Sequence, residues 1–403
     1  MTTAPAGAGA SGAALLRYLF AGFCASLVTI GLARFVYTPL LPVLIQAHWF
    51  TASQAVYLGA ANLAGYLAGA LIGRATGRRL GNVAALRGMM LVAALSFFAC
   101  AVPVSVAWFF AWRLVSGVAG GVVMVLIAAT VLPHVPPARR GMAGGAIFVG
   151  AGLGIAASGT LVPLLLDYGL QATWMGLGVL SAVLCAASWY AWPPMSATAA
   201  AAAMPSGAAR AVHGAGVTTL YVEYAFMAAG FVPGMVFLVD FVARGLGAGA
   251  HLGGLFWVVY GVGAIIGPAL YGWLIDRLGV RATVRWVLLS QAVAMAGLYR
   301  VQGYAGIGAL ALVLGMFPAG LPPMILARLQ QLIPHDIPAQ GLAWSRATII
   351  FATLQAAAGY GYSMLFDASA GNHRLMFLTG AAWTLAALLL DLAPAWPAHA
   401  KAR

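Results

Sequence analysis

Three ionisable side chains lie deep inside long apolar runs of this sequence: Arg34, Arg113 and Glu223. An arginine at the centre of a membrane helix costs at least about 2.5 kcal/mol, so it persists only where it faces water, a partner or backbone carbonyls. Its planar guanidinium can hold a carboxylate through two parallel hydrogen bonds. A carboxyl group in an apolar wall can hold and release a proton. These residue types therefore predict the binding of an organic anion and the movement of a proton.

Aromatic residues and prolines accompany the first of these charges. Tyr37 lies one turn after Arg34, and Pro39 and Pro42 follow. Prolines free backbone carbonyls and bend a membrane helix, which is tolerated where a cavity or a neighbouring helix satisfies those groups. We therefore expect this helix to line a cavity. The residues expected to bind the substrate are Arg34, Tyr37, Arg113 and Tyr224, with Glu223 as the proton carrier.

Two of these roles leave alternatives open. Arg113 could instead be a structural arginine that donates to backbone carbonyls. Glu223 could be the ion-pair partner of Arg34 or Arg113, a role that is compatible with carrying a proton.

The remaining ionisable residues predict no catalytic or metal site. Asp240 is expected at the outer surface, paired with Arg244 four positions on. His373 and the other histidines near helix ends are expected at the membrane interface, and no pair has the spacing of a metal site. The three cysteines indicate neither a disulfide framework nor a thiolate site. No phosphate loop, dinucleotide fingerprint or nucleophile elbow rises above chance, so neither a cofactor nor enzymatic activity is expected.

The composition indicates which elements must position these residues. The chain has 403 residues, of which 63% are hydrophobic and 7% charged, whereas a soluble domain carries about 25% charged residues. Apolar runs long enough to cross a bilayer recur along the whole chain, which predicts an all-α, multi-pass membrane protein. Twelve helices are expected, at 15–46, 53–73, 83–102, 106–132, 141–166, 172–193, 217–243, 251–276, 282–302, 304–333, 341–366 and 373–396.

One stretch rich in Ala, Pro, Gly and Ser separates the sixth and seventh expected helices and has the composition of a linker. It divides the chain into a six-helix bundle at 1–193, a linker at 194–216 and a second six-helix bundle at 217–403.

The formal net charge of +13 comes from arginines that gather in alternate short loops, such as Arg74 to Arg79 and Arg277 to Arg285. Positive charge in short loops orients a membrane protein with those loops in the cytoplasm. This distribution argues against nucleic acid as a partner and predicts cytoplasmic termini and a cytoplasmic linker, in the inner membrane of a cell.

The two halves repeat a motif. The loop after the second helix reads Gly69-Ala-Leu-Ile-Gly73-Arg74, and the loop after the eighth reads Gly272-Trp-Leu-Ile-Asp276-Arg277-Leu-Gly279-Val-Arg281. The second loop resembles the loop motif of the major facilitator superfamily, and Arg113-x-x-x-Gly117 is similar to a weaker motif of that superfamily. The string Ala33-Arg34-Phe35-x-Tyr37-Thr38-Pro39 further resembles an uncharacterised bacterial branch, the YbfB type.

The resemblance implies two six-helix bundles that rock about a substrate site near the bilayer midplane. It also implies a conformational latch at the cytoplasmic face, formed by Asp276 against the amino end of the fifth helix, with Gly272, Arg277, Gly279 and Arg281 in the same motif. A carboxylate there would meet the positive end of the helix dipole. Asp276 could instead be a solvated acid paired with Arg277 or Arg281. In the first loop, Gly73 occupies the position of the acid, which departs from the motif.

Together these features predict a monomeric secondary transporter that works by alternating access. We expect it to carry a small organic anion as a proton symporter, because two deep arginines make the cavity positive. Two alternatives remain: proton-driven export of amphipathic toxic compounds, and a membrane scaffold or sensor without flux.

Overall fold

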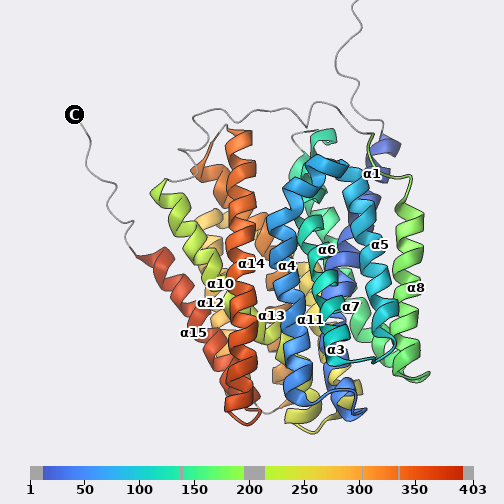
Figure 1. Cartoon of the computed structure of the whole chain (residues 1–403). Helices are drawn as coiled ribbons and strands as arrows, with labels where there is room; N and C mark the ends of the chain where they lie inside the picture. The colour runs from blue at the N-terminus through green and yellow to red at the C-terminus, as the bar shows by residue number, and fades with distance from the viewer. Residues whose placement is uncertain (1–11, 137–138, 195–213, 302, 335, 394–403) are drawn as a thin grey trace, which may run out of the picture.

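A computed structural model describes residues 12–136, 139–194, 214–301, 303–334 and 336–393 of the chain. These residues lie mostly in long helices that run side by side, and none of them forms a strand (Figure 1). The helices are α1 (Gly12–Ser26), α2 (Ala33–Phe35), α3 (Tyr37–Gln46), α4 (Ala52–Leu80), α5 (Asn82–Cys100), α6 (Val106–Val131), α7 (Arg140–Leu166), α8 (Leu170–Ser188), α10 (Ala215–Asp240), α11 (Gly249–Leu278), α12 (Val280–Arg300), α13 (Tyr304–Leu332), α14 (Ile337–Ala368) and α15 (His373–Leu392).

Eleven stretches in the described part of the chain are long and apolar enough to cross a membrane, the first being Gly12–Gln46 as one unit. The ninth helix expected from the sequence is present as α12, which has 21 residues. It is not among the eleven, and it carries three arginines. The all-helical class is therefore confirmed. The expected linker, 194–216, lies almost entirely outside the described residues.

The first expected helix is not regular. A π-helical turn, η1 (Leu27–Leu32), separates α1 from the short α2 that carries Arg34. Such turns inside α-helices occur mostly at functional sites. Within it, Gly31 packs on α7, where a Cβ on Gly31 would come within 2.8 Å of the Gly154 Cα. The close approach of two backbones therefore requires glycine at both positions, and it fixes the start of α2 against α7.

The same packing pattern occurs in the parts of the chain before and after residues 195–213. We call residues 12–194 the N-terminal segment and residues 214–393 the C-terminal segment. α4 packs on α6, and α11 packs on α13; α5 packs on α8, and α12 packs on α15. Between the segments, α4 packs on α14 and α7 packs on α11. The internal sequence repeat thus has a counterpart in the helix contacts.

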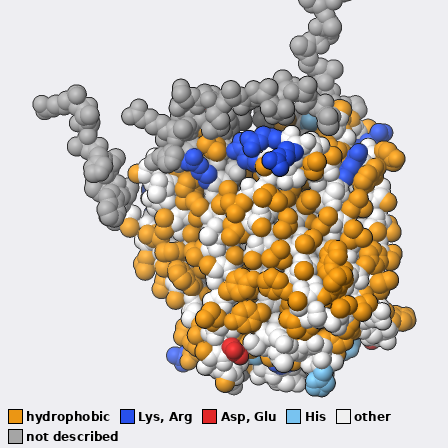
Figure 2. Space-filling view, in the orientation of Figure 1, with side chains coloured by type: hydrophobic (Ala, Val, Ile, Leu, Met, Phe, Trp, Pro, Cys, Tyr) orange, Lys and Arg blue, Asp and Glu red, His pale blue; other side chains and the backbone are white. Residues whose placement is uncertain are grey.

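Hydrophobic side chains cover most of the visible face, and Lys and Arg side chains gather at one end of it (Figure 2). That arginine-rich end includes the last turn of α4, with exposed Arg78 and Arg79, and the last turn of α11, with exposed Arg277. The opposite end contains the start of α4 and the loop between α14 and α15.

The two segments touch mainly in the half of the helices that lies away from the arginine-rich end. There Thr38 Oγ1 donates to the Met235 carbonyl at 2.6 Å, and the rings of Tyr57 and Tyr360 lie 6.2 Å apart. The α7–α11 seam is tightest near Gly261, where an added Cβ would come within 2.3 Å of the Ala156 nitrogen.

Toward the arginine-rich end the same helices have open space beside them. A Cβ added at Gly144 of α7, Gly272 of α11 or Gly341 of α14 would meet no atom within 4 Å. The contacts between the segments named above therefore lie in the half away from the arginine-rich end.

Candidate functional site

Arg34 lies on α2 at the contact between the segments. Every residue from Gly31 to Leu40 is buried except Arg34, which keeps partial exposure. Its guanidinium carbon lies 4.7 Å from the ring centroid of Tyr66 and 5.6 Å from that of Phe35. Its Nε and Nη2 atoms are buried, and no residue that the structure describes accepts a hydrogen bond from them. These buried donors are not used by the described residues and are available to an anionic ligand.

Phenol groups from both segments surround this guanidinium. Arg34 interacts electrostatically with Tyr66 of α4, Tyr224 of α10 and Tyr260 of α11. The Tyr260 hydroxyl is buried and, within the described part of the chain, has no hydrogen-bond partner. Arg34 and Tyr224, both expected at the substrate site, therefore share one environment.

Aromatic rings form the walls of this environment. The Phe35 ring lies 6.5 Å from Phe231 and 6.2 Å from Trp257, both in the C-terminal segment. Trp257 stacks on Tyr260 at 4.6 Å. Its indole nitrogen donates to Ser158 Oγ of α7 at 2.8 Å, which fixes the orientation of the ring across the seam.

A buried glutamine belongs to the same region. Gln355 of α14 is fully buried, and neither its amide nitrogen nor its amide oxygen has a partner among the described residues. It lies one turn after Phe351, whose ring is 4.5 Å from that of Tyr224. It lies one turn before Gly359, which abuts Leu63 of α4. Residues four apart share a helix face, so Gln355 faces α4 and α10 near Tyr66 and Tyr224.

Arg113 and Tyr37 lie in a different environment, inside the N-terminal segment. Arg113 is buried, and its Nη1 donates to the Ala33 carbonyl at 2.8 Å. Its guanidinium carbon lies 4.4 Å from the Tyr37 ring centroid, and the Tyr37 hydroxyl donates to the Ala55 carbonyl at 2.6 Å. Of the two interpretations of Arg113, this geometry favours the arginine that ties helices together.

Glu223 faces the interior of the C-terminal segment. It is buried, and its Oε1 has no hydrogen-bond partner among the described residues. The charged groups that act on it are Asp391, Arg328, Arg281 and Arg285. The described residues form no ion pair between Glu223 and Arg34 or Arg113.

The latch motif lies at the arginine-rich end of α11. Asp276 and Arg277 are both exposed, and the Arg277 guanidinium carbon lies 5.0 Å from the Trp273 ring centroid. Gly279 makes the turn into α12 with φ of +81°, a conformation that favours glycine. The motif's other residues are Gly272, which has open space beside it, and Arg281, which pairs with Asp391 at 3.6 Å rather than with Asp276.

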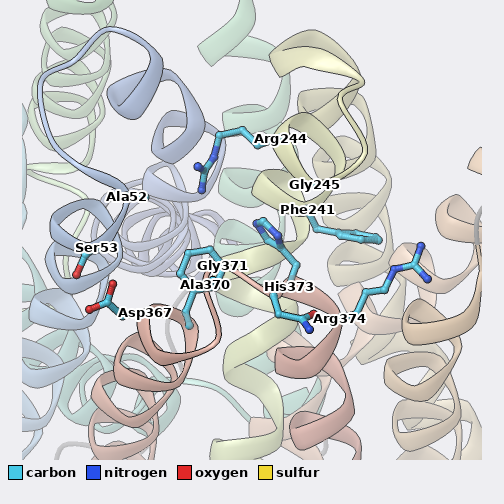
Figure 3. A pocket seen from close by; sticks show the side chains of 12 residues that line it. Ala52, Ser53, Phe241, Arg244, Gly245, Asp367, Ala370, Gly371, His373 and Arg374 are labelled. Atoms are coloured by element: carbon cyan, nitrogen blue, oxygen red, sulfur yellow. The ribbon is translucent and has the colours of Figure 1, made fainter.

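A second polar site lies at the opposite end, around a cavity of about 560 Å³ (Figure 3). Asp240 lies behind this cavity, where it accepts bonds from Arg244 and lies 2.6 Å from His373 Nε2. The pair with Arg244 was expected, but the surface location of Asp240 was wrong, because its side chain is fully buried. The cause is His373 of α15, which is far away in the sequence and covers the carboxylate.

Several of the residues around Arg34 could not be identified by reading the sequence. Tyr66, Trp257 and Tyr260 are ordinary aromatic residues in apolar runs, so nothing in their spacing distinguishes them from core. Gln355 did carry a signal, as an uncharged polar residue near the middle of an expected membrane helix. Polar residues at that depth usually face a partner or a cavity.

Comparison with known proteins identifies a family. A family model described as "Uncharacterised MFS-type transporter YbfB" matches residues 26–391, which is nearly the whole chain. No curated protein matches the chain.

Proposed function

The chain belongs to the family of uncharacterised YbfB-type major-facilitator transporters, and on that premise we propose that it carries a small organic anion across the inner membrane. The family makes it a multi-pass membrane protein with a small-molecule substrate. The anion is our proposal, and it rests chiefly on one observation: Arg34 holds buried, unpartnered donors at the contact between the two segments.

Electrostatics supports an anion at Arg34. The described residues form no ion pair with its guanidinium. A buried charge without a partner is strongly unfavourable, and a carboxylate would remove that cost while using the two donors of the planar fork. Tyr224 and Tyr260 lie close enough to contribute hydroxyl groups from the second segment.

We further propose that residues 1–193 and 217–403 form two six-helix bundles that alternate access to this site. The repeated packing of α4 on α6 and α11 on α13 supports two equivalent bundles, with α12 as the twelfth crossing. The named contacts between the segments lie away from the arginine-rich end, which supports a state open to that end. By the positive-inside rule that end is cytoplasmic, so the state would face inward. The exposed Asp276 fits a latch that is released in this state.

Proton coupling through Glu223 completes the proposal and would make the protein a monomeric symporter. Glu223 is the one glutamate of the chain, and it is buried without a hydrogen bond to Oε1 from the described residues. Its charged neighbours lie in the C-terminal segment. Coupling to Arg34 would therefore pass through Tyr224, the next residue on α10, or through a change in the position of α10.

Binding measured on purified protein tests the anion. We expect carboxylates, but not lipophilic cations, to raise the melting temperature, because a ligand that binds the folded form stabilises it. Arg34→Lys should weaken carboxylate binding at least about tenfold, since lysine keeps the charge but loses the planar fork. Arg74→Lys, a change at an exposed loop position, is the matched control and should bind normally.

Two results would contradict the proposal. Carboxylate binding unaffected by Arg34→Ala would remove Arg34 from the site. Stabilisation by lipophilic cations alone would favour the export of amphipathic compounds. Concentrative uptake into proteoliposomes separates both kinds of carrier from a scaffold or sensor without flux.

A further inference from the structure

The residues around Arg34 also restrict which anion could bind, and this inference rests on the function proposed above. Arg34 supplies one positive charge to the contact between the segments. Arg113, the other deep arginine, keeps its charge, but its buried guanidinium lies inside the N-terminal segment, where Nη1 donates to the Ala33 carbonyl and the carbon lies 4.4 Å from the Tyr37 ring centroid. A ligand with two carboxylates would bury its second charge without a cationic partner, which is strongly unfavourable. The single positive charge of Arg34 therefore favours a ligand with one carboxylate.

The walls of the site indicate an aromatic body for that ligand. Rings from both segments lie near the guanidinium: Phe35 and Tyr66 lie within 5.6 Å of its carbon, and Phe231 and Trp257 of the C-terminal segment lie 6.5 Å and 6.2 Å from the Phe35 ring. Aromatic rings associate through offset and edge-to-face contacts in addition to the burial of their area. A sugar or other polyol would need a hydrogen bond for each hydroxyl, and the few uncharged polar groups of these mainly aromatic walls do not supply that many.

Two uncharged polar groups in the region keep unused hydrogen-bonding capacity. The Tyr260 hydroxyl is buried without a partner among the described residues, and its ring stacks on Trp257, which lies 6.2 Å from Phe35 beside Arg34, so we expect it to donate to the same carboxylate. The Gln355 amide is fully buried, and neither of its polar atoms has a partner among the described residues. A buried amide with both ends unused is costly, and such a group in a binding site usually awaits a ligand group. Gln355 can both donate and accept, so a hydroxyl suits it.

We propose that the site takes an aromatic monocarboxylate that carries a second hydrogen-bonding group. The carboxylate binds Arg34 and Tyr260, the ring lies among the aromatic side chains of both segments, and the second group binds Gln355.

The test compares probe acids on purified full-length protein by calorimetry. The probes are benzoate, the three hydroxybenzoate isomers, cyclohexanecarboxylate and benzene-1,4-dicarboxylate. We expect at least one hydroxybenzoate to bind about tenfold more tightly than benzoate, because a site built to bond a hydroxyl disfavours the analogue that lacks it. Benzoate should bind more tightly than cyclohexanecarboxylate, and the dicarboxylate should bind most weakly.

Variants of Gln355 test whether this residue binds the second hydrogen-bonding group of the ligand. Gln355→Leu should abolish the preference for the hydroxybenzoate and leave benzoate affinity nearly unchanged. Gln291→Leu is the matched control, since Gln291 is a second buried glutamine with an unpartnered Nε2 among the described residues, but it lies on α12. That variant should keep the preference.

The outcomes separate this inference from the proposed function. Equal, Arg34-dependent binding of the aromatic and saturated acids would overturn the inference and leave an anion carrier in place. A hydroxyl preference that persists in Gln355→Leu would overturn the role of Gln355. If no carboxylate binds at all, the proposed function fails as well. The relative affinities of benzoate and cyclohexanecarboxylate for the unmodified protein show whether the site prefers an aromatic ring, even if Gln355→Leu does not fold.

Discussion

At the scale of single residues, two arginines in similar apolar surroundings differ in how many of their donors are used, although each has a buried Nε without a hydrogen bond among the described residues. The Nη1 of Arg113 donates to the Ala33 carbonyl of α2, and its guanidinium lies against the Tyr37 ring. Arg34 keeps two buried nitrogens without a hydrogen bond from the described residues. The first arrangement stabilises the fold, and the second holds binding capacity at a cost in stability.

This contrast predicts opposite effects on stability. Arg113→Met should lower the melting temperature of the purified protein by several degrees, since a hydrogen bond to a charged group contributes about 1.5–3 kcal/mol. Arg34→Met should leave it unchanged or raise it, while carboxylate binding is lost. Scanning fluorimetry of both variants in detergent checks the prediction. The reverse order of melting temperatures would mean that Arg34 is the structural arginine.

At the scale of the helices, the α7–α11 seam determines how closely the two segments approach. Glycine at position 261 lets the α11 backbone lie against Ala156, and an added Cβ would fall 2.3 Å from a backbone nitrogen. Backbone cannot move aside as a flexible side chain can. A larger residue therefore has to separate α7 from α11 at that level.

Gly261→Ala should accordingly shift the population toward the state in which the end away from the arginines is open. Distances between spin labels on α7 and α11, measured by double electron–electron resonance, report the shift. Gly272→Ala on the same helix is the control, because its added Cβ meets no atom within 4 Å. An identical distance distribution in Gly261→Ala and Gly272→Ala would show that the seam does not set the state.

The same spin-label distances between α7 and α11 test the latch proposed for Asp276. If Asp276 closes the arginine-rich end in the alternate state, Asp276→Asn should move the population further toward the state seen here, opposite in direction to Gly261→Ala. An unchanged distribution would indicate that Asp276 is an ordinary exposed acid.

At the scale of the whole molecule, transport against a gradient requires that proton binding and substrate binding affect one another. Glu223 lies in the C-terminal segment, and Arg34 lies in the N-terminal segment. They form no ion pair in the described structure. Coupling between them would therefore pass through Tyr224, which follows Glu223 on α10, or through a change in the position of α10 relative to the N-terminal segment.

Glu223→Gln, which mimics the protonated carboxyl permanently, should still exchange substrate but lose accumulation against a gradient. Counterflow and proton-driven uptake, measured on the same proteoliposomes, distinguish the two activities. If Glu223 only stabilises α10, both should decline together. Concentrative uptake by the variant would exclude Glu223 as the proton carrier and direct attention to Asp240 and His373.

The sequence by itself determined the helical class, the approximate helix limits and the family. Hydropathy depends on length and composition alone, and a loop motif such as Gly272 to Arg281 is contiguous in the chain. For the same reason the sequence identified Arg34 and Glu223, because a charge inside an apolar run is conspicuous wherever its partners lie.

Only the tertiary structure decided which of these residues share an environment. It places Arg113 against the Tyr37 ring, places Arg34 beside Tyr66, and buries Asp240 beneath His373. None of these relations is visible in hydropathy, because each depends on the rotation of a helix about its axis and on the helix it packs against. Those rotations are set by contacts between residues distant in the sequence, such as Gly31 on Gly154 and Gly261 on Ala156.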